Sequence, residues 1–459
     1  MITKIKYTLL VAAAGYMLSS CTSLYSSYER PKETLEVDSL FRFIEATNDT
    51  TTIASIPWQT FFTDAKLQAL IELGLENNTS LAVAHLNVEQ AEVALRSARL
   101  AYLPTLNATP QAGVANFNSA TTQTYNLSLA ASWEVDIFGK IRNAKERSKM
   151  AFEQSKAYEQ AVKTQLIATI ANSYYSLLLL DKQLNISKDT EQNWKENLRT
   201  MEALKKAGNA NQASVLQTEA NTIALAAQIM TTEKQIAELE NALSALLSVT
   251  PQRIERGVLT AVSFPTELSH GVPLQLLSNR PDIRVAEYSL AQAFYATNES
   301  RSALYPNITL SGAAGFTNSG GGGITNPGDW LFNAIGSIVQ PIFNAGVLRG
   351  QVTISKAKQE QALLQFNQAI LDAGVEVNNA MTQLQTAQKR LVLDARQVSI
   401  LTKAVRSSKL LMQNGSANYL EVLTAQNTLL QAELTESSDR YNEIQGVINL
   451  YRAVGGGER

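Results

Sequence analysis

The chain carries the same sequence pattern twice, and this internal repeat restricts its fold more than any other feature. Residues 99–104 read Arg-Leu-Ala-Tyr-Leu-Pro, and residues 301–306 read Arg-Ser-Ala-Leu-Tyr-Pro, an offset of 202. Residues 136–142 correspond to residues 341–349, where a longer loop and two extra residues at the turn bring the offset to 207. We therefore expect two copies of one structural unit, with equivalent elements in equivalent order.

Beyond this turn, apolar residues recur at steps of three and four in both copies. One series contains Leu166, Ile170, Ser173, Leu177, Leu180 and Leu184, and the second copy repeats its steps in Ala373, Val377, Ala380, Leu384, Ala387 and Leu391. The return segments give Leu216, Ala220, Ile223, Ala227 and Met230, matched by Leu423, Asn427, Leu430, Leu434 and Ser437. Such steps are typical of helices with one narrow apolar seam. The run from Arg142 to Ala207 would be roughly 100 Å long as a helix, which favours a coiled coil over an ordinary bundle. An interruption near Asn185 to Asp189 is left open.

Each half is predicted to contain an opening helix, two strands, a very long helix, a turn and a return helix. The first repeat covers residues 64–250 and the second residues 280–454, with a linker at 251–279. The opening helices are expected from about Asp64 to Leu100 and from about Pro281 to Leu304, because proline suits a first helical turn. The hairpin tips are placed near 208 and 415, where glycine can cap the incoming helix. An arm at 21–63 precedes the repeats, and a tail at 455–459 follows them.

Between the helices lie four segments of strand length, at about 104–117, 124–137, 306–317 and 329–342. Their alternation of apolar and polar residues and their length fit strands of a membrane barrel, and Trp133, Trp330 and Tyr125 could form an aromatic girdle. Four strands cannot close such a barrel, since the smallest have about eight. Closure therefore requires at least two chains, and the strand count alone does not choose between two and three. The fold class is a mixed α/β membrane protein.

The N-terminus is predicted to be a lipoprotein signal peptide, residues 1–20. Lys4 and Lys6 precede an apolar run that is too short to span a bilayer as a helix. The run ends in Leu18-Ser19-Ser20-Cys21, which looks like the lipobox in which the cysteine is acylated. Cys21 is the only cysteine, so no disulfide can form within one chain. Thr22 follows it, which favours sorting to the outer membrane over retention at the inner membrane.

Composition and motifs argue against several other functions. Without residues 1–20 the chain has 37 basic and 41 acidic residues, so nothing suggests the basic patch of a nucleic-acid-binding protein. His85 and His270 are the only histidines, and neither has a second histidine or cysteine at metal-ligand spacing. No catalytic grouping stands out, so we expect no enzymatic activity, no metal and no cofactor apart from a covalent lipid on Cys21.

With these features the chain resembles the TolC-like outer-membrane efflux proteins, and in particular their OprM-type (NodT-like) lipoprotein branch. The residues that carry the resemblance are 18–21, 131–139, 279–287, 340–346 and 415–426, in the right order along the mature chain. The resemblance implies a homotrimer with a twelve-stranded barrel in the outer membrane, continued by a periplasmic barrel of twelve helices. It also implies docking on a periplasmic adaptor that is bound to an inner-membrane pump of the proton-driven RND type.

The resemblance also suggests where function lies. In the family the helical tips meet the adaptor, and here these are Gly208, Asn209, Gly415, Ser416 and Tyr419. The family closes the tips partly with acidic rings six and nine residues after the second glycine. Those positions are Glu421 and Thr424 in this chain, so only the first keeps an acid. The equivalent positions of the first repeat, Ser214 and Gln217, are neutral.

Two alternatives remain at this stage. The same duct could serve a type I protein-secretion system, although lipidation favours the efflux branch. A structural coiled-coil lipoprotein spacer would need the long helices and Cys21, but not four segments of barrel length. The exported substrate cannot be inferred, because a wide aqueous pore carries little specificity.

Overall fold

The computed structural model describes residues 26–31, 56–117, 120–208, 210–262, 264, 280–318, 329–414, 416 and 419–457. Cys21, Asn209, Gly415 and His270 lie outside these residues, as does much of the predicted linker. The chain divides into two compact units. One contains Leu86–Ala157 and Arg284–Gln368 with the segment at 26–31, and the other contains residues 56–85, Tyr158–Ile283 and the chain from Ala369 onwards.

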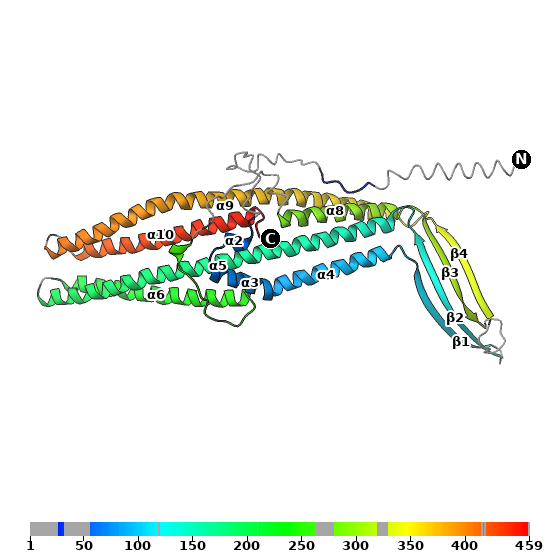
Figure 1. Ribbon diagram of the computed structural model, residues 1–459, viewed down its shortest axis with the longest axis horizontal. Helices are drawn as coiled ribbons and strands as arrows, with labels where there is room; N and C mark the ends of the chain where they lie inside the picture. Colours follow the sequence, from blue (N-terminus) through cyan, green and yellow to red (C-terminus); the bar gives the residue numbers. More distant parts are fainter. Residues whose placement is uncertain are drawn as a thin grey trace. The chain divides into compact units, whose positions relative to one another are not determined.

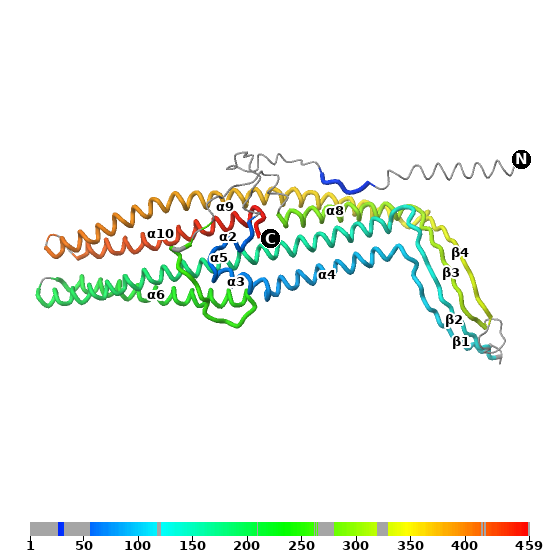
Figure 2. Tube along the Cα trace, viewed as in Figure 1, coloured from blue at the N-terminus to red at the C-terminus, as the bar shows by residue number. Residues whose placement is uncertain are grey.

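Helices dominate both repeats, and each repeat contributes two strands (Figures 1 and 2). The first repeat contains α2 (Trp58–Phe61), α3 (Ala65–Asn77), α4 (Thr79–Leu100), β1 (Thr105–Phe117), β2 (Ala120–Val135), α5 (Lys140–Lys206) and α6 (Gln212–Leu246), followed by the short helix η4 (Leu259–Ala261). The second repeat contains α8 (Pro281–Ser302), β3 (Asn307–Thr317), β4 (Asp329–Val339), α9 (Val347–Gln413) and α10 (Tyr419–Ala453).

The element bounds reproduce the sequence repeat. Helix α8 begins and ends 202 residues after α4, and α9 and α10 begin and end 207 residues after α5 and α6. The glycines of the strand-to-helix turns, Gly139 and Gly346, both have positive φ, 72° and 79°. Glycine adopts this conformation without the steric cost that other residues incur. The predicted repeat is therefore present in the backbone itself.

The C-termini of the two return helices also end in the same way. At the end of α6, Val249 N–H donates to the Ser244 carbonyl at 3.0 Å, and at the end of α10, Gly456 N–H donates to the Tyr451 carbonyl at 2.8 Å. These six-residue loops are Schellman caps, which satisfy carbonyls that the helix leaves unpaired. The left-handed residue of the cap is Gly455 in the second repeat but Ser248, at φ 56°, in the first.

The first opening helix is not continuous, contrary to the prediction of one helix from about Asp64 to Leu100. It breaks at Asn78, between α3 and α4. The Asn78 side chain accepts a hydrogen bond from Leu81 N–H at 3.0 Å and donates one to the Leu246 carbonyl at 2.8 Å. Asparagine competes well for backbone groups in this way, so it caps a new helix instead of continuing the old one.

The long helix α5, in contrast, runs without a break from Lys140 to Lys206. The interruption considered near Asn185 to Asp189 is therefore wrong. Its equivalent α9 has the same length, 67 residues. In the second unit α5 and α6 form one antiparallel hairpin and α9 and α10 another (Figure 2).

One predicted seam is also wrong. On α6 the expected seam residues Leu216, Ile223 and Met230 are exposed. The buried face is shifted and contains several threonines: Val215, Thr218, Thr222, Leu225, Ile229, Thr232 and Ile236. Each of these threonine hydroxyls donates to the carbonyl four residues earlier, so the methyl group can pack while the polar atom stays satisfied. A seam predicted from apolar residues alone does not include these threonines. The equivalent seam of α10 is buried at Leu423, Leu430 and Ser437, as predicted.

The four strands form one antiparallel sheet in the order β1-β2-β3-β4. The pairing between β2 and β3 joins the two repeats, for example through Trp133 opposite Leu310. The described part of the chain contains the four predicted strands, with β1 and β4 as the edges of the sheet. Each edge strand has backbone groups that point away from the sheet.

We predict that Asn78→Ala loosens the first turn of α4, because one buried side chain makes both hydrogen bonds there. Loss of such a cap costs about 1 to 2 kcal/mol, so the amides of residues 79–82 should exchange hydrogen about tenfold faster. The control is Asn77→Ala, whose exposed side chain makes no hydrogen bond in the described structure. Equal exchange in the two variants would contradict the role of Asn78.

Candidate functional site

The sheet has one apolar and one polar face. The register places apolar side chains of neighbouring strands in common rows across one face: Leu106 and Ala131; Leu129, Ala314 and Phe332; Trp133 and Leu310; Val135, Ile308 and Ile338. The opposite face is mostly polar and carries Asn107, Thr109, Asn126, Ser128, Glu134, Thr309, Ser311 and Ser337, with Leu331, Ile335 and Val339 among its apolar exceptions. Such a division is typical of strands that separate lipid from an aqueous lumen.

Aromatic residues lie at both ends of the apolar face. Trp133 lies near the helices, and its indole N–H donates to the Tyr102 carbonyl at 2.9 Å. Near the other end Trp330 stacks on Phe316, with ring centroids 5.0 Å apart. The two rows are six residues apart along β3, or about 20 Å. This distance is of the order of the apolar band of a membrane barrel, which is flanked by aromatic girdles. Trp133, Trp330 and Tyr125 all point to the apolar face, as a girdle requires.

The turn between β2 and α5 is held by Asp136, whose carboxylate accepts hydrogen bonds from Ile141 N–H at 3.1 Å and Arg142 N–H at 2.7 Å. A carboxylate at a helix N-terminus pairs free donors and complements the helix dipole. Phe138 in this turn stacks on Tyr305 of the second repeat, with centroids 5.0 Å apart and planes at 11°.

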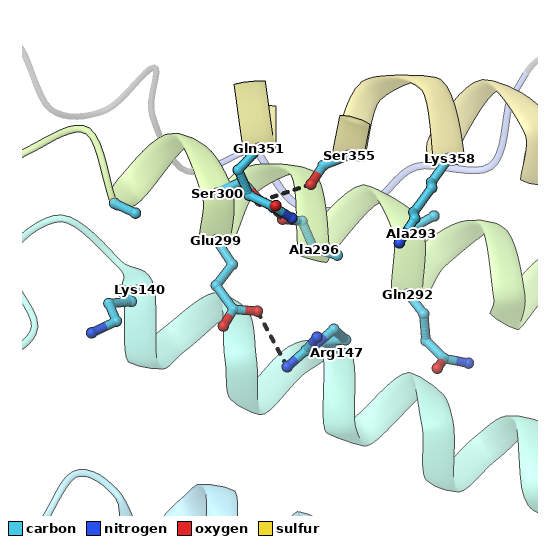
Figure 3. A pocket seen from close by; sticks show the side chains of 11 residues that line it. Lys140, Arg147, Gln292, Ala293, Ala296, Glu299, Ser300, Gln351, Ser355 and Lys358 are labelled. Atoms are coloured by element: carbon cyan, nitrogen blue, oxygen red, sulfur yellow. Dashed lines mark hydrogen bonds and ion pairs between the residues drawn. The ribbon is translucent and has the colours of Figure 1, made fainter. Parts of the chain in front are cut away.

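A groove of about 460 Å³ lies between α5, α8 and α9, close to the start of the strands (Figure 3). Arg147 on α5 pairs with Glu299 on α8 at 3.4 Å, and the hydroxyls of Ser300 and Ser355 are 2.8 Å apart. A neighbouring groove shares Lys140 and Ala303 with it and is also lined by Glu134, Asn307 and Thr309. These last three residues lie on the polar face of the sheet, so the neighbouring groove borders that face.

The hairpin tips are closed by a small apolar cluster. It consists of Met201, Val215, Tyr419 and Leu423, with Leu198, Leu204, Ala210 and Met412 at its margin. Gly208 has φ 80°, which suits the tight turn that follows α5. Asn211 caps α6 by accepting a hydrogen bond from Ser214 N–H at 2.8 Å. The cluster joins both hairpins, since its four buried members come from α5, α6 and α10.

The predicted tip and gate residues occupy different environments. Gly208 and Ser416 are exposed. Tyr419 is only 8% exposed, and burial raises the pKa of its phenol. Its side chain therefore has little surface to offer a partner and instead fills the tip cluster.

Glu421 and Thr424 are both exposed in the first turns of α10. Residues three apart share one face of a helix, so the structure places these two side chains together. Glu421 also complements the positive end of the helix dipole.

The described residues show no group of three or more histidines, cysteines and acids that could hold a metal. His85 pairs with Glu159 at 3.0 Å. Among the same residues, no helix has the length and apolar character needed to cross a membrane.

Sequence analysis missed an ion-pair network within the second unit. Arg280 is buried and donates to Asp282 at 2.7 Å, to Glu376 at 2.6 Å and to the Ala453 carbonyl at 2.6 Å. Arg452 pairs with the same Glu376. Arg280 is the repeat equivalent of Asn78, and Ala453 is the equivalent of Leu246. Both side chains therefore bond the last carbonyl of a return helix, and the known offsets could have revealed this match.

Comparison with known proteins agrees with a sheet that faces lipid on one side and long helical hairpins. Residues 70–249 and 272–456 match the outer membrane efflux protein family. The chain is 28% identical to the probable outer membrane lipoprotein SilC of Salmonella typhimurium, over 98% of this chain and 99% of SilC. It is also 28% identical to the cation efflux system protein CusC of Escherichia coli, over 98% and 99%.

Solved structures agree in fold. A CusC structure superposes with a TM-score of 0.86 at 27% identity, covering 94% of this chain and 99% of that one. The open state of the MtrE outer membrane channel of Neisseria gonorrhoeae gives 0.84 at 27% identity, covering 95% and 98%.

We predict opposite outcomes for a lysine placed on the two faces of β2. Leu129→Lys puts a charge on the apolar face, where lysine costs about 2 to 4 kcal/mol at mid-membrane, so less protein should reach the outer-membrane fraction. Ala130→Lys, one residue further, puts the same charge on the polar face and should leave that amount unchanged. Quantitative immunoblots of membrane fractions measure both. Equal loss in the two variants would contradict the assignment of the faces.

Proposed function

The chain belongs to the outer membrane efflux protein family, and from this premise we propose that it forms one third of a trimeric exit duct for small molecules. It is an outer-membrane channel protein of an efflux system. In the proposal, the duct is anchored by a lipid on Cys21. It docks on a periplasmic adaptor and receives its cargo from an inner-membrane pump of the RND type. The observation that carries the shared duct is the sheet of four strands with two edges, which needs further copies of the chain to close; the number three follows from the family.

The pairing of the repeats inside one chain supplies a template for pairing between chains. Within the chain, β2 of the first repeat pairs with β3 of the second. Strand β4 is the repeat equivalent of β2, and β1 is the equivalent of β3. The equivalent contact between chains would therefore pair β4 of one copy with β1 of the next. Such head-to-tail contacts generate closed rings when the rotation per subunit closes. Three chains give twelve strands, the number that the family resemblance implies.

Exposed side chains beside the edges support the same contact. Phe138 and Tyr305 stack inside the chain, and their repeat equivalents are Phe343 and Leu103. Phe343 is 89% exposed and Leu103 60% exposed. In a ring, Phe343 of one copy would meet Leu103 of the next, so both apolar side chains would be covered.

The arm near the N-terminus has a defined docking place, which supports lipidation at Cys21. Tyr28 packs edge-on against Phe294 of α8, with centroids 5.8 Å apart, and Arg30 pairs with Glu287 at 3.3 Å. Cys21 lies seven residues before Tyr28, so it can reach at most about 24 Å from it. Phe294 lies eight residues before the end of α8, or about 12 Å along the helix. A lipid on Cys21 can therefore reach the level where the strands begin.

The proposed gate lies at the tips. Three copies of Glu421 around one axis would concentrate negative charge in a narrow passage and favour cations there. Thr424 shares the helix face but carries no charge. Tyr419 holds the tip cluster together. The predicted turn residues Gly208, Asn209, Gly415 and Ser416, of which the described Gly208 and Ser416 are exposed, would contact the adaptor.

The first test of the proposal is the mass of the detergent-extracted protein, by light scattering corrected for bound detergent. We expect three chains, from the outer-membrane fraction. Cys21→Ser should lose incorporation of labelled palmitate but remain a membrane-embedded trimer, because the barrel holds it there. A stable monomer would contradict the shared barrel and favour the lipoprotein spacer, and a palmitate label retained by Cys21→Ser would place the lipid elsewhere.

We further predict that Glu421→Gln lowers the preference of the channel for cations over anions about fivefold. One unit charge at about 4 Å in water is worth about 1 kcal/mol, and the substitution removes that charge from each chain. Reversal potentials in planar bilayers under a salt gradient measure the preference. Glu219→Gln on α6 removes an equal charge from the other hairpin and should have no effect. Unchanged selectivity in Glu421→Gln would remove this residue from the gate.

A further inference from the structure

Two aspartates face each other in the middle of the second hairpin, far from its tip. Asp394 lies on α9 and Asp439 on α10, and they are only 8% and 4% exposed. Asp394 lies nineteen residues before the end of α9, or about 29 Å from the tip along the helix. Neither residue belongs to the proposed gate.

The polar groups around the pair do not balance its charge. The Asp439 carboxylate accepts a hydrogen bond from Arg390 Nε at 2.7 Å and one from Asn442 Nδ2 at 3.2 Å. The Asp394 carboxyl lies within hydrogen-bonding reach of Asp439, but its Oδ2 atom is buried without a partner among the described residues. The charged groups that act on Asp394 are Asp439, Arg390 and Glu436. If both aspartates were ionised, two buried carboxylates would share one guanidinium.

The first hairpin has no such charges at the equivalent positions. At the offset of 207, the first-repeat equivalents of Asp394, Asp439 and Arg390 are Ser187, Thr232 and Gln183. Ser187 and Thr232 are both buried. The fold therefore accepts small neutral polar groups at these two buried positions, which hold titratable groups in the second repeat and not in the first.

We propose that Asp394 and Asp439 form a proton-binding site, a carboxyl pair that holds one proton between α9 and α10. One proton leaves a single negative charge, which Arg390 balances. It also makes one carboxyl a donor, so that a hydrogen bond replaces a repulsion between two carboxylates. The ligand of the site is the proton itself, and the site ties the two helices of the second hairpin together when it is occupied.

The direction of the pH effect follows from linkage. Burial, together with the Asp439 carboxyl, raises the pKa of Asp394 above its ordinary range. The closed hairpin then binds the proton more tightly than the opened one. Its stability against opening is therefore greatest below the ordinary aspartate pKa of about 3.9 and falls as the pH rises through the raised value. Acid should tighten the second hairpin at these positions relative to the equivalent positions of the first.

Hydrogen exchange of the intact protein in detergent tests the site without reference to transport. Protection factors of amides near 390–398 and 436–442 are compared with those near 183–191 and 229–235, at neutral pH and near pH 4. We expect the ratio of the two sets to rise on acidification by about tenfold for each unit by which the pKa is raised. A ratio that does not change with pH in the natural protein would overturn the proposal.

Two variants sharpen the test. Asp394→Asn keeps the size of the side chain but cannot ionise, so protection should already be higher at neutral pH and its response to acid should be much smaller. A pH response of unchanged size in Asp394→Asn would also overturn the proposal, because it would then come from other groups such as Glu433 on α10, whose pKa burial also raises. In the reverse experiment, Gln183→Arg, Ser187→Asp and Thr232→Asp together place the triad in the first hairpin. That hairpin should then gain the same pH dependence, and its failure to do so in a folded trimer would count against the pair as the cause.

Discussion

The two unpaired edges of the sheet are the constraint on which the rest of the structure depends. Strands β1 and β4 present backbone N–H and C=O groups that no other described strand bonds. In hydrocarbon each unpaired group costs several kcal/mol, so only closed barrels span membranes as strands. The chain carries the same two-stranded unit twice, and each unit can pair its edge strand with the edge strand of another such unit. The pairing of β2 with β3 already shows the contact that β4 and β1 need.

The repeat is also the part of the structure that the sequence predicts best, and the reason is physical. Strand-to-helix turns need glycine at positive φ, and helix starts accept proline. Gly139, Gly346 and Pro281 can therefore be recognised in the sequence as turn and helix-start residues. The steps of three and four that give long helices are equally visible. The offsets of 202 and 207 therefore predict equivalent elements, and the observed bounds of α8, α9 and α10 repeat those of α4, α5 and α6 at these offsets.

Side-chain environments were predicted less well, because they depend on which neighbour a helix face meets. The seam of α6 uses threonines whose hydroxyls bond their own helix, so an apolar count placed it on exposed residues. Asn78 fits a helix interior as well as a cap until Leu246 is known to lie beside it. The burial of Tyr419 and the pairing of Asp394 with Asp439 both require the packing of separate helices, which no local pattern encodes.

The two hairpins share a backbone plan but differ in charge, and this difference has a structural cause. A duct wall built from repeated hairpins needs the same lengths, caps and turns in each copy, so those features are preserved between the repeats. Charge at buried or tip positions is free to differ, as long as each hairpin can satisfy it. The first hairpin carries Ser187, Thr232 and Ser214 where the second carries Asp394, Asp439 and Glu421. Protonation of Asp394 on α9 therefore acts on the second hairpin, whereas Ser187 offers no titratable group at the equivalent position of the first.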